Sequence, residues 1–76
     1  MSKVKAVKIH NSYKTYDDNE ALWEVDATLT FADGTSRRYE FDWVRAGHMH
    51  ALKHPRSADA QEMFEDLLER DSSRVA

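Results

Sequence analysis

Two segments of the chain alternate strictly between apolar and polar residues, and this period of two constrains the fold more than any other feature. In segment 23–31 the odd positions are apolar and the even positions are acids or threonines, and in segment 38–43 the odd positions are aromatic and the even positions are charged. Such alternation is typical of antiparallel strands with one buried face and one solvated face. The predicted inward residues are Trp23, Val25, Ala27, Leu29 and Phe31 on one strand, and Tyr39, Phe41 and Trp43 on the other.

The connection between these strands contains Ala32, Asp33 and Gly34. A two-residue turn at Asp33-Gly34 would pair odd positions with even ones, and would set the apolar face of one strand against the polar face of the next. A three-residue loop keeps the faces matched and places Gly34 in the left-handed conformation that glycine adopts at little cost. The predicted cross-strand pairs are therefore Trp23 with Trp43, Val25 with Phe41, and Ala27 with Tyr39.

The residues before and after this hairpin complete the fold. Segment 4–10 predicts a first strand with Val7 and Ile9 inward, which could continue with a bulge to Tyr16 before turn-forming residues at 17–20. Segment 46–53 predicts a short helix that His54-Pro55 would end. A longer helix follows, with Ser57 as its N-cap and Asp59 in its first turn. Its apolar stripe consists of Ala60, Met63, Phe64, Leu67 and Leu68.

The predicted fold class is therefore α+β. It is a three-stranded antiparallel β-meander with its first and third strands at the edges, followed by a short helix and a longer C-terminal amphipathic helix packed on one sheet face (βββαα). We predict one small domain over residues 1–71 and a disordered C-terminal tail over residues 72–76, since 76 residues leave no room for a second core.

Composition narrows the class of protein. The chain has no cysteine, so disulfides and thiolate metal ligands are excluded. No segment has the length of a signal sequence core or a membrane span, so we expect a cytoplasmic protein without membrane contact. There is no G-x-S-x-G motif and no glycine-rich phosphate loop, and the chain is too short to enclose a pocket. We therefore expect a non-enzymatic protein without a cofactor.

Charge is segregated along the chain, although the net charge is only −3. Residues 1–16 carry four lysines and no acid, whereas residues 17–43 carry eight acids against two arginines. Residues 44–56 are basic again, and residues 57–71 carry six acids against one arginine. Blocks of both signs indicate specific electrostatic contacts with a partner more than general affinity for nucleic acid.

The predicted register brings acids together on the outer sheet face. Glu24 would lie opposite Asp42, and Asp26 opposite Glu40, in like-charged pairs that cost stability. Such a patch is a candidate binding surface. The alternative is an ordinary solvated face that water and the flanking cations Lys8, His10 and Arg38 screen. A second candidate surface is the outer face of the last helix, with Glu62, Glu65, Asp66 and Glu69.

Three of the four histidines lie within seven residues, at positions 48, 50 and 54. On a helix, His48 and His50 point about 160° apart, and His50 and His54 share the exposed side. A zinc site needs three or four converging ligands. We therefore predict no metal site and a fold that does not depend on zinc; histidine contacts with an anionic partner are the intermediate possibility.

These observations lead to three functional hypotheses. The first is a protein-binding inhibitor or adaptor that masks a basic, nucleic-acid-binding surface of its partner. In size, charge and lack of cysteine the chain is comparable to phage-encoded inhibitors of host systems such as CRISPR, but no motif carries a family resemblance. The second, disfavoured by the acidic total, is direct nucleic-acid binding. The third is a regulatory homodimer formed through an edge strand, residues 36–44. The second hypothesis would use Arg37, Arg38, Arg45, Lys53 and Arg56.

Overall fold

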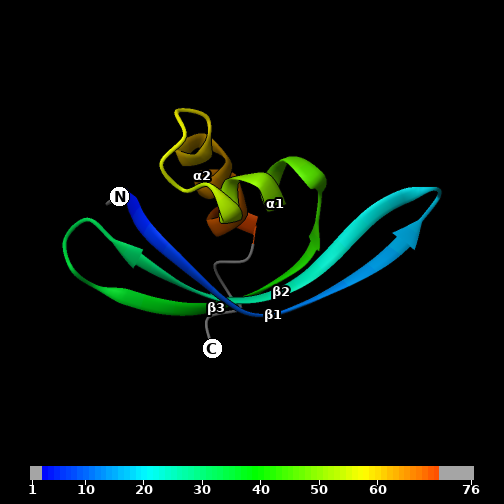
Figure 1. The fold of residues 1–76 in the computed structure, drawn as a ribbon, viewed down its shortest axis with the longest axis horizontal. Helices are drawn as coiled ribbons and strands as arrows, with labels where there is room; N and C mark the ends of the chain where they lie inside the picture. Colours follow the sequence, from blue (N-terminus) through cyan, green and yellow to red (C-terminus); the bar gives the residue numbers. More distant parts are fainter. Residues whose placement is uncertain (1–2, 71–76) are drawn as a thin grey trace.

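A computed structural model of the chain describes residues 3–70. Its elements are β1 (Val4–Asp17), β2 (Glu20–Phe31), β3 (Ser36–Val44), α1 (Ala46–Lys53) and α2 (Ala60–Arg70). The strands form one antiparallel sheet in the order β1-β2-β3, and both helices lie on the same face of it (Figure 1). The predicted βββαα fold is confirmed. The predicted tail at residues 72–76 lies outside the described residues.

The β2–β3 hairpin has the predicted three-residue loop. The Phe31 N–H donates to the Thr35 carbonyl at 2.8 Å, and the Gly34 N–H donates to the Phe31 carbonyl at 3.0 Å. Gly34 has a φ of 89°, in the region that side chains disfavour. Asp33 supports the turn, because its carboxylate accepts hydrogen bonds from the backbone and the hydroxyl of Thr35. The predicted pairs of Val25 with Phe41 and of Ala27 with Tyr39 are both present.

The other end of the β2–β3 pair differs from the prediction. Trp23 pairs with Val44, and Trp43 is 56% exposed. The register shifts between Trp23 and Val25, so that two residues, Asp42 and Trp43, oppose the single residue Glu24. This is a β-bulge, and it reverses the alternation of β3 at its end. The predictions that Trp43 points inward and pairs with Trp23 are therefore wrong: Val44 takes the buried position, with no exposed surface.

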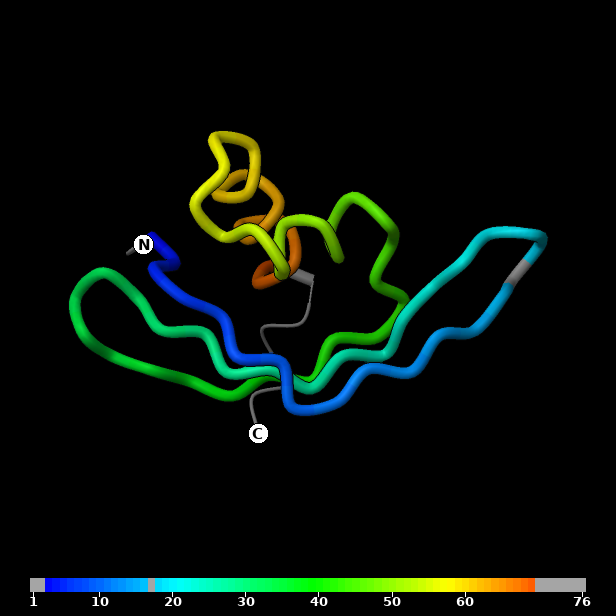
Figure 2. Tube along the Cα trace, in the orientation of Figure 1, coloured from blue at the N-terminus to red at the C-terminus, as the bar shows by residue number. Residues whose placement is uncertain are grey.

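β1 continues past its predicted core segment, as the sequence suggested. Ile9 pairs with Ala27 and Asn11 pairs with Asp26, so the strand has an irregularity at His10. Its far part forms a two-stranded arm with the start of β2, and this arm extends beyond the helices (Figure 2). The turn at its tip places Asp18 and Asn19 at positive φ values of 48° and 66°. Residues with short polar side chains tolerate this conformation well.

The helices close the core against the inner sheet face. The apolar stripe of α2 is placed as predicted, with Phe64 and Leu67 almost fully buried. The N-cap assignment of Ser57 is wrong, because residues 55–59 form turns and the Ser57 carbonyl accepts the Ala60 N–H at 3.1 Å. The helix therefore begins at Ala60, two residues later than a Ser57 cap implies, and the prediction that Asp59 lies in its first turn is wrong because Asp59 directly precedes the helix. The buried core residues include Val25, Ala27, Leu29, Tyr39, Phe41, Val44, Met49, Leu52, Phe64 and Leu67.

Gln61 connects α2 to the outer edge of β1. The Val4 N–H donates to Gln61 Oε1 at 3.1 Å, and Gln61 Nε2 donates to the Val4 carbonyl at 3.0 Å and to the Pro55 carbonyl at 3.1 Å. The side-chain amide thus bonds both backbone groups of Val4, as a neighbouring strand would. No helix of residues 3–70 is long and apolar enough to cross a membrane.

Candidate interaction faces

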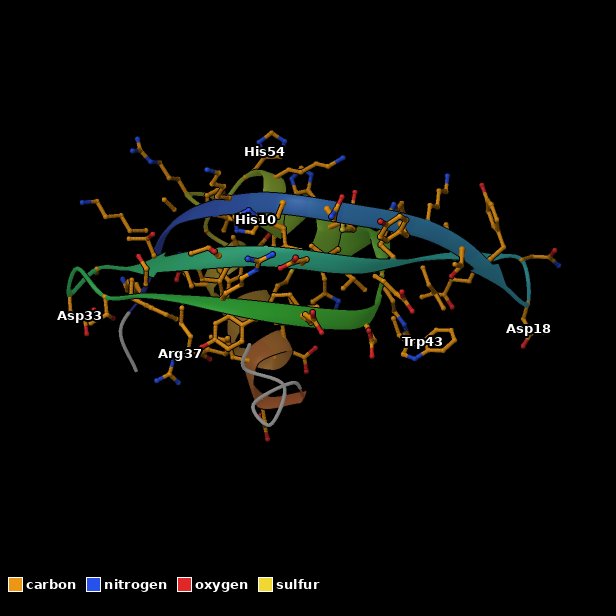
Figure 3. The ribbon with its side chains drawn as sticks, turned by 90° about the horizontal axis from the view of Figure 1, so that it is seen from below. His10, Asp18, Asp33, Arg37, Trp43 and His54 are labelled. Atoms are coloured by element: carbon orange, nitrogen blue, oxygen red, sulfur yellow. The ribbon has the colours of Figure 1, made fainter. Side chains whose placement is uncertain are left out.

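The outer face of the sheet, opposite the helices, is the strongest candidate site (Figure 3). Strand alternation sends the side chains of Glu24, Asp26 and Glu40 to this face. Asp26 pairs with Glu40, as predicted. The predicted direct pair of Glu24 with Asp42 is changed by the bulge, because Asp42 and Trp43 together oppose Glu24. All four predicted carboxylates nevertheless line one open hollow of about 230 Å³. We call it the outer hollow; it is lined by Asn11, Tyr13, Glu24, Val25, Asp26, Glu40, Phe41 and Asp42.

Arg38 changes the charge of this face. Its Nε and Nη2 donate to the two carboxylate oxygens of Asp26 at 2.8 and 2.6 Å, a bidentate pair. The hydrogen bonds from Arg38 are the main cause that lowers the pKa of Asp26 below its usual value. Asp26 is therefore an ion-paired group, and its predicted cost opposite Glu40 is offset. The acids of the outer hollow that remain exposed to solvent are Glu24 and Glu40.

Other polar groups complete the outer face along β1 and β2. The ring of His10, labelled in Figure 3, lies 2.8 Å from the Thr28 hydroxyl, measured from its Nε2. Next to the β2–β3 loop, the hydroxyls of Thr30 and Ser36 are 3.0 Å apart. This end of the face is hydrogen-bonded and also carries cations, because Lys8 and Arg38 both pair with Thr28, so the carboxylates of the face are concentrated at the outer hollow.

The second acidic surface lies on α2, which packs on the other face of the sheet (Figure 1). Its four predicted acids are exposed. Asp66 is engaged across the helix pair, because its Oδ2 lies 2.9 Å from His48 Nε2 on α1. The acids on this helix are Glu62, Glu65, Asp66 and Glu69.

The histidines are distributed as the helical geometry predicted. His48 lies at the border of the core with 17% of its side chain exposed. Within the part of the chain that the structure describes, its Nδ1 is buried without a hydrogen-bond partner. His50 and His54 are exposed, with ring centroids 4.7 Å apart. Among residues 3–70, no three acidic or histidine side chains are grouped closely enough to hold a metal ion. The independence of the fold from zinc stays a prediction.

The five residues of the basic alternative do not form one surface. Arg38 is bound to Asp26, and Arg45 Nε lies 3.4 Å from Glu20 Oε1. Figure 3 shows Arg37 beyond the β3 edge and His54 beyond the β1 edge. Lys53 and Arg56 lie beside His54, where they line a shallow basic depression. These five residues therefore do not form a continuous path for a phosphate backbone.

Two exposed aromatic residues near the outer hollow were not among the predicted site residues. Tyr13, which is 62% exposed, lines the hollow, and Trp43 is next in sequence to Asp42, which lines it too. The apolar character of Trp43 and its odd position made it a core residue by alternation. Tyr13 could have been found from the position of the β1 irregularity, since the residues beyond it change faces.

The chain was also compared with known proteins. No protein-family model, no curated protein and no solved structure matches it.

Proposed function

We propose that this chain is a non-enzymatic module that binds a protein partner and masks a basic, nucleic-acid-binding surface on it. The observation that carries the proposal is the placement of exposed carboxylates on two separate surfaces, the outer hollow and α2. Arg38 and Arg45, in contrast, are paired with acids. Such a charge layout steers the protein toward a cationic surface and competes with phosphate groups for it.

The experiment that tests this function uses the chain as bait to recover a protein partner from lysate. Variants with reversed charge on one acidic surface are compared with the unaltered chain. One variant carries Glu24→Lys and Glu40→Lys, and the matched variant carries Glu62→Lys and Glu65→Lys. Asp26 and Asp66 are left unchanged, because their ion pairs with Arg38 and His48 would confound the result. We expect one of the two variants to lose a partner that the unaltered chain recovers from lysate.

The recovered partner is then tested by filter binding with its own nucleic acid. We expect the unaltered chain to displace the nucleic acid, and the displacement to weaken as salt is raised, because exposed charge pairs are screened. If both reversed variants recover the same proteins as the unaltered chain, or if the partner binds chain and nucleic acid together, the masking function is wrong.

A further inference from the structure

Two large aromatic side chains are exposed at one end of the outer face. Tyr13 on β1 is 62% exposed and Trp43 on β3 is 56% exposed. The β1–β2 register places Tyr13 opposite Glu24, and the bulge places Trp43 opposite the same residue. Glu24 is thus flanked by an aromatic residue on each neighbouring strand. Exposed aromatic residues of this size are a common feature of protein-binding surfaces.

The backbone keeps Trp43 on the outside. Its φ of 58° lies in the left-handed region, where a bulky residue is an outlier. Regular alternation would have turned Trp43 under the helices and left Val44 exposed. The bulge reverses this order, so that the smaller side chain fills the core and the indole faces solvent. A strained residue that holds a large apolar side chain in water indicates a role outside folding.

The charges next to these rings are mostly acidic, and Arg38 is close enough to act electrostatically on Glu40. Glu24 and Glu40 are exposed, and within residues 3–70 no ion pair involves either of them. Asp26, in contrast, is already neutralised by Arg38. The hollow therefore offers the exposed carboxylates of Glu24 and Glu40 together with two exposed aromatic side chains, Tyr13 in its lining and Trp43 next in sequence to its lining residue Asp42.

We infer that the outer hollow docks an arginine-bearing segment of the protein partner, with Tyr13 and Trp43 contacting the guanidinium planes and Glu24 and Glu40 accepting their hydrogen bonds. This inference rests on the proposed function and assigns it to one of the two acidic faces. A guanidinium combines a planar surface that stacks on aromatic rings with a donor pattern that fits carboxylates. An ammonium group gains less from the same surroundings, so the hollow favours arginine over lysine.

The inference is tested with a labelled peptide of alternating glycine and arginine, and with its lysine counterpart, by fluorescence anisotropy in 50 mM salt. The aromatic variant carries Tyr13→Ala and Trp43→Asn, which leave the net charge unchanged. Asparagine tolerates the left-handed conformation, so the thermal midpoint should not fall. We expect about tenfold weaker binding of the arginine peptide, which corresponds to two cation–π contacts, and a smaller loss for the lysine peptide.

The charge control compares two double variants. One carries Glu24→Gln and Glu40→Gln, and the other carries Glu62→Gln and Glu65→Gln. Each pair removes two charges, but only the first pair lies in the outer hollow. Equal losses from both pairs, or unchanged affinity in the aromatic variant, overturn the docking site. Loss of binding in the α2 pair alone also overturns it, yet leaves the masking function in place on the other face. Masking of a recovered partner is scored separately, so failure of the function is distinguishable from failure of the site.

Discussion

At the scale of single residues, the two glycines have opposite effects on stability. Gly34 has a φ of 89° with no atom within 4 Å of an added Cβ, so only its backbone conformation resists a side chain. Gly47 lies in α1, and its added Cβ would meet Met63 at an ordinary 3.6 Å. We expect Gly34→Ala to lower the free energy of unfolding by about 1 kcal/mol. Gly47→Ala should raise it by roughly 0.5–1 kcal/mol. Urea denaturation measures both, and a stable Gly34→Ala variant would contradict the hairpin geometry.

Asp26 has a predictable pH dependence. Arg38 lowers the pKa of this carboxyl, chiefly through hydrogen bonds to its charged form. The stabilisation is therefore complete above the unfolded pKa of about 3.9, and it is lost as the pH falls through the lower folded pKa. We expect Arg38→Gln to raise the pKa of Asp26 in a carboxyl NMR titration. Arg37→Gln, a change at the neighbouring position, should leave it unchanged; equal shifts in both variants would refute the assigned pair.

At the scale of elements, Gln61 replaces a neighbouring strand at the start of β1. It bonds the N–H and the carbonyl of Val4 and also reaches Pro55. We expect Gln61→Ala to cost about 1–2 kcal/mol, because part-buried backbone groups lose their partners. Gln61→Glu keeps the acceptor for the Val4 N–H but places a carboxylate oxygen against the carbonyls of Val4 and Pro55, so its cost should be at least as large. Chemical denaturation ranks the three proteins, and equal stability would show that the contact contributes nothing.

The same contact bears on self-association. Removal of Gln61 would free backbone groups at the β1 edge, and exposed strand edges recruit other strands. Sedimentation of the Gln61→Ala variant should therefore report more association than that of the unaltered chain. The homodimer through residues 36–44 stays a prediction, which light scattering over a range of concentrations checks.

The elements show which features a sequence of this kind reveals. Alternation predicted the faces of β2 and β3, and parity predicted the loop at Gly34, because both depend on local pattern. The bulge at Trp43 was not predictable in this way, since a single additional residue reverses alternation without a characteristic composition. The four carboxylates were predicted to lie together. The ion pair between Asp26 and Arg38 was not predicted, because it depends on a diagonal contact between the two strands.

At the scale of the whole molecule, the fold should not depend on zinc. His50 and His54 are adjacent on the surface, but His48 is held by Asp66 on the other helix. Within the described residues, a third ligand near the exposed pair is therefore missing. We expect the thermal midpoint to agree within about 1 °C in EDTA and in stoichiometric zinc, because metal that binds the native state tightly would raise it. A rise of several degrees with zinc would contradict this.

The arm formed by β1 and β2 should be the least stable part of the sheet. The helices cover the central sheet, whereas the arm extends past them with two strands (Figure 2). In its β1 half, residues 11–16 are all exposed, and in the β2 half Leu22 is buried. Two-stranded ribbons with so little buried surface open easily. We expect amides of residues 12–16 to exchange with solvent at least about tenfold faster than those of residues 25–29, measured by NMR.

Binding of the arginine peptide should slow exchange around Tyr13, because the ligand would have to hold the arm in place to occupy the outer hollow. Equal protection along β2 from Leu22 to Leu29 would show that the arm folds together with the core, as one cooperative unit.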